Sequence, residues 1–219
     1  MIWFPLSVFA LLIILGLTFI PDSKKGSGFI FSCVFALLAS FLVSFLYSFI
    51  KKSFPLTDDA VRIMLHYMVH DHLFFYYPGA VTVLLCLLCI RKDFTRYSAQ
   101  AAASVLFLFY MFLAMLATFF YSPHGNWADP HLIFYLAGSR IFQCLAFASV
   151  AHFVVLKSEW FYMLTALIVI LIIPFVTAFV SYFYYTCNIR MAGVFLILIY
   201  CAALAVYSAA VILGRRLKA

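Results

Sequence analysis

Seven apolar stretches, each about as long as a bilayer is thick, are the feature that most limits what this sequence can fold into. A helix needs about 20 apolar residues to cross roughly 30 Å of hydrocarbon. In lipid each stretch must be helical, because backbone N–H and C=O groups without water must pair within their own segment. We therefore predict an all-α, polytopic transmembrane helix bundle of about seven spans. The predicted spans are 2–20, 28–50, 74–90, 99–121, 132–156, 160–184 and 191–213.

The composition agrees with a membrane protein. The 219 residues are 68% hydrophobic and 10% charged, whereas soluble domains average about 45–50% apolar and 25% charged residues. No repeat, low-complexity tract or soluble domain is visible, so we expect residues 1–219 to form a single integral membrane domain. The first apolar stretch lacks a basic n-region and a small-residue cleavage site, so we expect it to remain as a span.

The net charge of +7 is explained by topology. The basic residues stand in small groups between apolar runs, which is typical of cytoplasmic membrane loops and not of a nucleic-acid-binding patch. Alternate connections carry nine and four of them, although Lys51 and Lys52 oppose the bias. The two sets are Lys24, Lys25, Arg91, Lys92, Arg96, Lys157, Arg215, Arg216 and Lys218, against Lys51, Lys52, Arg62 and Arg190.

The positive-inside bias places the larger set in the cytoplasm. We therefore predict an integral protein of the cell inner (plasma) membrane, with the N-terminus outside and the C-terminus in the cytoplasm. The predicted partners are the lipid bilayer and, in one interpretation, other membrane subunits. No nucleic-acid partner is expected.

The segment 57–72 has the pattern of a short amphipathic helix. Thr57 is a suitable N-cap, and Asp58 and Asp59 would occupy the first turn, where the helix dipole favours anions. Too short and too charged to span, this helix should lie at the outer interface or fold inward as a lid. Its polar residues fall within an arc of roughly 120° at about 100° per residue. They are Asp58, Asp59, Arg62, His66 and His70.

Two prolines predict breaks in the helices. Pro78, followed by glycine, should separate the third span from the amphipathic helix before it. Pro174 should kink the sixth span.

Histidines on the predicted outer side suggest a metal site. His66 and His70 stand at i and i+4, the spacing by which one helix offers two imidazoles to one ion. The next outer connection adds His124, Asp129 and His131, so zinc is the first metal to consider. Two other interpretations stay open: a pH-sensing cluster, or interfacial histidines bonded to water, headgroups or loops. No cofactor is certain.

Arg140 is the second candidate, because it lies well inside the fifth span, with Gln143 one turn away. An intramembrane cation is expensive and should face the bundle interior. The predicted spans contain no carboxylate to pair with it. Structural pairing and anion binding are equally open, and Arg140, Gln143, Asp59 and Arg62 form the predicted polar vestibule.

Two hypotheses for function follow. The first is a small transporter or channel, or an integral subunit of a larger membrane complex, with a polar vestibule on the outer side. The alternative is a membrane-embedded, metal-dependent enzyme that acts on a lipid or lipid-linked substrate. The sequence contains no P-loop and no G-x-S-x-G motif, which favours the non-enzymatic hypothesis.

Overall fold

The structure is a computed structural model, and it describes six stretches of the chain. They are residues 26–50, 59–91, 96–121, 130–156, 160–186 and 188–216. All of the regular structure in them is helical, as predicted. The predicted first span, 2–20, lies outside the described residues.

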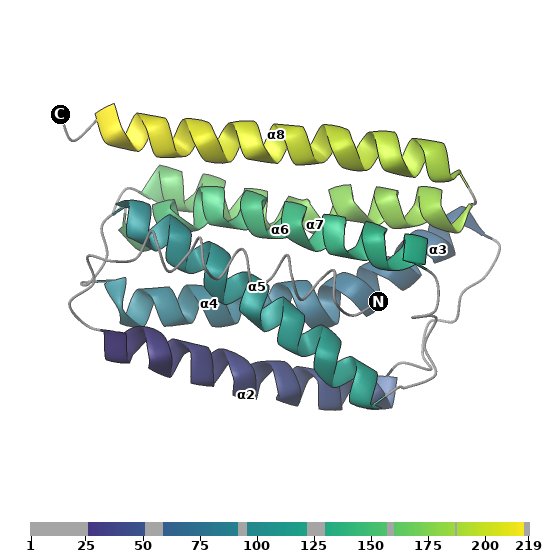
Figure 1. Cartoon of the computed structure of the whole chain (residues 1–219), viewed down its shortest axis with the longest axis horizontal. Helices are drawn as coiled ribbons and strands as arrows, with labels where there is room; N and C mark the ends of the chain where they lie inside the picture. The colour runs from purple at the N-terminus through teal and green to yellow at the C-terminus, as the bar shows by residue number, and fades with distance from the viewer. Residues whose placement is uncertain are drawn as a thin grey trace.

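The helices lie side by side along the long axis of the molecule, and successive ones run in opposite directions (Figure 1). Helices α3, η1 and α4 follow one another without a break and count as one rod in this alternation. The helix ends therefore alternate between the two ends of the bundle. The elements are α2 (Gly26–Ile50), α3 (Ala60–Tyr67), η1 (Met68–Tyr76), α4 (Tyr77–Cys89), α5 (Arg96–Tyr121), α6 (Pro130–Leu156), α7 (Trp160–Tyr185) and α8 (Ile189–Arg216).

Helices α5 and α6 form the centre of the bundle. Helix α5 packs on α2, α4 and α6, and α6 also packs on α7 and α8. The first turns of α5 bury a run of alanines at 101–103, and such small side chains let helix backbones approach closely. Further along, Phe107 of α5 stacks on Phe147 of α6, with ring centroids 4.8 Å apart.

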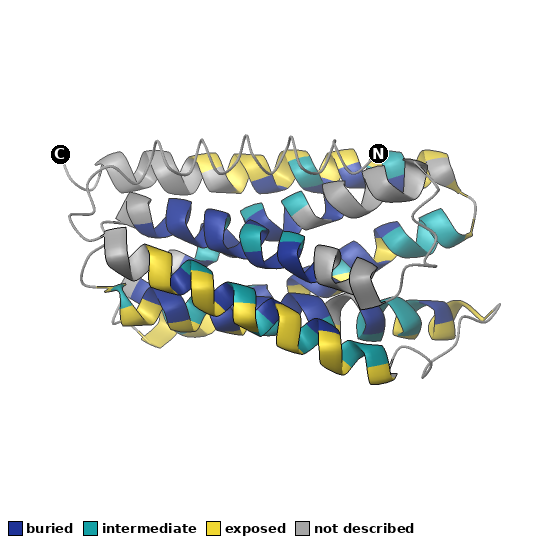
Figure 2. Cartoon of the chain, turned by 60° about the horizontal axis from the view of Figure 1, so that its bottom comes forward, coloured by how far each residue is buried: buried dark blue, intermediate teal, exposed yellow. Residues whose placement is uncertain are grey.

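Exposed residues lie mainly on the outer helices and buried residues gather in the middle (Figure 2), and many of the exposed residues are large and apolar. Phe31 on α2 is 72% exposed and Phe161 on α7 is 73% exposed. Polar groups such as Ser40, Ser44 and Gln143 are buried instead. Three helical rods among the described residues are long and apolar enough to cross a membrane, which indicates a membrane protein. They are Ile30–Phe49, Ala60–Cys89 and Trp160–Tyr185.

The predicted separate amphipathic helix is wrong, because α3 continues through the π-helix η1 into α4 as one rod of 30 residues. Helix α3 begins at Ala60, and its N-cap, Asp59, makes no side-chain capping bond. Thr57 and Asp58 lie outside the described residues. Pro78 does not interrupt the rod, and it stands where the π-helix η1 passes into the α-helix α4.

Gly79 follows that proline and allows α4 to approach α5 closely. A Cβ atom at this position would lie 2.6 Å from Cδ1 of Tyr110. Only a residue without a side chain therefore fits between the two helices here.

Candidate functional site

A buried histidine lies where η1 meets α2. His70 is 5% exposed, and its Nδ1 atom lies 3.0 Å from the hydroxyl oxygen of Tyr47 on α2. The Tyr47 ring also makes edge contacts with His70 and with Phe75, at centroid distances of 5.6 and 5.0 Å. The tyrosine therefore fixes both the position of the imidazole and the use of one of its ring nitrogens.

His66 extends this site towards the start of α3. Its ring lies over that of His70, with the centroids 4.2 Å apart and the planes tilted by 39°. His66 is half-buried, whereas Asp59 and Arg62, closer to the start of the helix, are exposed. The two imidazoles therefore lead from the exposed end of the rod to the buried contact with α2. We call Tyr47, His66 and His70 the histidine site.

Gln143 lies elsewhere in the interior, between α6 and α7. It is fully buried, and its Nε2 donates to Oγ1 of Thr177 over 3.0 Å. The predicted vestibule is therefore divided, with Asp59 and Arg62 exposed on α3 and Gln143 engaged with α7. Arg140 belongs to α6, three residues before Gln143, but its side chain lies outside the described part of the structure.

The structure describes two of the five predicted metal ligands, His66 and His70. His124 and Asp129 lie outside the described residues, and so does the side chain of His131 at the start of α6. Within the described part of the chain, no three His, Cys, Asp or Glu side chains come close enough to hold a metal ion. The zinc site stays a prediction, with His66 and His70 as its described candidates.

Sequence reasoning missed the tyrosine and threonine hydroxyls that join the helices. Tyr47 and Thr177 lie in apolar helices at spacings that match no known motif, so the sequence gives no reason to single them out. Tyr76 and Tyr77 were missed for the same reason, although each donates a hydrogen bond to a backbone carbonyl of α7. A signal was present for Tyr76, since Pro174 leaves a carbonyl of α7 without its usual donor.

The histidine site combines groups that can bind a small polar molecule or ion. Imidazole donates and accepts hydrogen bonds and changes charge near neutral pH. The surrounding bundle is apolar on its outside, so these polar groups differ sharply from the surface around them. Comparisons with protein-family models, with curated proteins and with solved structures find no match for this chain.

Proposed function

We propose that this chain is a small transporter or channel that moves a small polar solute through an outer polar vestibule. The vestibule begins at the histidine site. Asp59 and Arg62, exposed at the start of the rod, would stand at its mouth, and we propose Arg140 of α6 as the inner cation that the solute meets. The solute would bind to the imidazoles before passing between the helices.

The observation that carries this proposal is the burial of His70 against Tyr47 inside a bundle with an apolar exterior. Burying a polar group in an apolar medium costs free energy even when the group is partly paired. Ionisable residues within membrane proteins usually line substrate or ion pathways for this reason. The contact with His66 continues the polar surface towards the exposed end of α3.

A topology with seven spans fits this proposal. The start of α3, the end of α5 and the start of α6 share one end of the bundle (Figure 1). This is the end with the fewer basic residues in its connections, so the positive-inside bias places it outside the cell inner membrane. With residues 2–20 as a further span, the N-terminus would be outside and the C-terminus cytoplasmic.

Flux measurements on reconstituted protein test the proposal. Proteoliposomes would be tested for osmotic swelling in chloride, phosphate, ammonium and glycerol solutions, with protein-free liposomes as the baseline. We expect at least one solute to enter faster than the baseline. His70→Gln should slow that entry about tenfold, the effect of losing about 1.4 kcal/mol of solute binding.

Tyr182→Phe is the matched control, because Tyr182 lies on α7 and its hydroxyl makes no hydrogen bond within the described part of the chain. This variant should leave the flux unchanged. Baseline flux for all four solutes, or a flux insensitive to His70→Gln, would contradict the proposal. Stable co-purification of other membrane proteins in mild detergent, together with absence of flux, would favour the subunit hypothesis.

A further inference from the structure

Helix α7 has a backbone carbonyl that its own helix cannot satisfy. Pro174 lies inside α7 and has no N–H, so the carbonyl of Ile170, four residues earlier, loses its normal donor. The hydroxyl of Tyr76, the last residue of η1, donates to this carbonyl over 3.0 Å. Tyr76 is fully buried, so its hydroxyl replaces the missing amide within the interior.

The next residue makes the next contact. The hydroxyl of Tyr77, the first residue of α4, donates to the carbonyl of Leu171 over 3.0 Å. Two adjacent tyrosines therefore reach two adjacent carbonyls across the helix interface. We call these two hydrogen bonds the tyrosine link.

The tyrosine link joins the end of the π-helix η1 and the start of α4 to the part of α7 just before Pro174. Proline turns are the common sites of helix bending, and π-helical segments occur frequently at functional sites. The Pro174 turn is also held from α6, because Thr177 donates to the carbonyl of Pro174 over 3.0 Å and accepts a hydrogen bond from Gln143. The Pro174 turn of α7 is thus bonded to η1 on one side and to α6 on the other.

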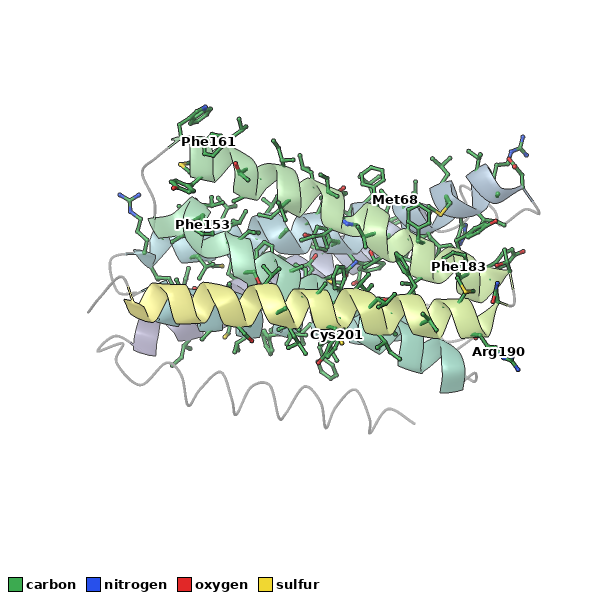
Figure 3. All side chains as sticks on the ribbon, turned by 90° about the horizontal axis from the view of Figure 1, so that it is seen from above. Met68, Phe153, Phe161, Phe183, Arg190 and Cys201 are labelled. Atoms are coloured by element: carbon green, nitrogen blue, oxygen red, sulfur yellow. The ribbon has the colours of Figure 1, made fainter. Side chains whose placement is uncertain are left out.

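The rod that carries His66 and His70 packs against α7. Helices α3 and η1 both pack against α7, and Met68, the first residue of η1, lies beside the half of α7 that carries Phe183 (Figure 3). His70 stands in the same π-helix, six residues before Tyr76. A displacement of η1 relative to α2 would therefore change the contact between His70 and Tyr47.

We infer that the tyrosine link couples bending of α7 at Pro174 to movement of η1, and so makes a hinge that opens and closes the histidine site. The inference rests on the proposed transport function for its purpose, although the coupling itself does not require transport. When α7 bends, the carbonyls of Ile170 and Leu171 move with it. The hydroxyls of Tyr76 and Tyr77 then carry that displacement into η1.

Hydrogen–deuterium exchange in nanodiscs tests the coupling with Pro174→Ala. The substitution restores a backbone amide that can bond the carbonyl of Ile170, so α7 should exchange more slowly around residues 170–178. The new amide then competes with the Tyr76 hydroxyl for this carbonyl and weakens the tyrosine link. Residues 68–76 of η1 should therefore exchange about tenfold faster, which corresponds to about 1.4 kcal/mol of lost protection. If exchange in η1 is unchanged in Pro174→Ala, the coupling is absent and the inference fails.

Two tyrosine variants complete the experiment. Tyr76→Phe should speed exchange in both η1 and α7, and adding Pro174→Ala should reverse the effect in α7 alone. Tyr182→Phe is again the control and should change neither segment. If Tyr76→Phe does not fold, Pro174→Ala still decides the question. Coupled exchange without solute flux would reject the proposed function and keep the hinge, whereas flux with uncoupled exchange would reject the hinge alone.

Discussion

Two interior regions of this bundle differ in whether their buried polar side chains are hydrogen-bonded. Around η1, polar side chains bond to neighbouring helices, as between Tyr47 and His70 or between Tyr76 and the carbonyl of Ile170. Along α5, Gln100 and Tyr110 are equally buried, but the Gln100 amide and the Tyr110 hydroxyl have no hydrogen-bond partner among the described residues.

The difference indicates two separate reasons for burying a polar residue: its hydrogen bonds in one region, and the shape of its side chain in the other. In the region around η1 the polar atoms join the helices, so their removal should loosen the bundle. In α5 the Tyr110 ring packs where Gly79 makes room for it, and the hydroxyl contributes no described bond. Shape should therefore matter there, and polarity should not. Four substitutions, measured by unfolding in mixed detergent micelles, test this contrast.

Gly79→Ala should have the largest effect, a loss of about 2–3 kcal/mol in the free energy of unfolding, as for other overpacked interiors. The new Cβ atom would lie 2.6 Å from one Tyr110 ring carbon and 2.7 Å from the next, and the ring is too buried to move away. Gly193→Ala is the control, since Gly193 lies on the outer helix α8 and is only half-buried. An equal effect of the two substitutions would show that the close approach is unimportant.

Tyr47→Phe should come second, with a loss of about 1 kcal/mol in the free energy of unfolding. It keeps the aromatic contacts and removes only the hydroxyl that lies 3.0 Å from Nδ1 of His70. The same substitution at Tyr182 provides the baseline for a tyrosine hydroxyl without a described bond. If the two variants are equally stable, the hydroxyl of Tyr47 does not help to join α2 to η1, and the contrast fails at the histidine site.

Gln143→Leu should lower the free energy of unfolding by about 0.6 kcal/mol, a typical value for a hydrogen bond between membrane helices. Leucine fills a similar volume, and Thr177 keeps the carbonyl of Pro174 as its acceptor. The substitution therefore removes the hydrogen bond from Gln143 to Thr177 and keeps the bond within α7. A loss of several kcal/mol would indicate that Gln143 also supports other groups.

Tyr110→Phe should have the smallest effect and the opposite sign, a gain of less than about 0.5 kcal/mol. The ring that packs on Gly79 is kept, while the substitution removes a buried hydroxyl that has no partner among the described residues. Equal losses for Tyr110→Phe and Tyr47→Phe would mean that both hydroxyls are bonded, and the contrast between the regions would disappear.

The sequence predicted the helices better than the connections between them. Apolar length placed the helix at 28–50 close to α2 and the one at 132–156 close to α6. The same criterion did not join residues 60–89, because it took the polar stripe of 57–72 as the mark of a separate helix, at the interface or folded inward as a lid. Instead, α3, η1 and α4 form one continuous rod, and α2 covers His70.

The candidate site was predicted only in part, for a related reason. The i, i+4 spacing predicted that His66 and His70 would lie together, because a helix alone sets that geometry. Their partner, Tyr47, is 23 residues earlier in the chain than His70, and no local pattern indicates such a contact. Gln143 was chosen as a neighbour of Arg140, but in the fold it bonds to Thr177.

By itself, the sequence determined that this chain forms apolar helices and where most of them begin and end, because hydrogen bonding within a helix and the length of its apolar run are local properties. Only the tertiary structure decided which polar groups meet. The hydroxyl of Tyr76 and the carbonyl of Ile170 are 94 residues apart, and they pair because η1 and α7 pack side by side. Such pairings depend on how neighbouring helices are rotated and aligned along their lengths, and the apolar pattern of a single helix does not specify either.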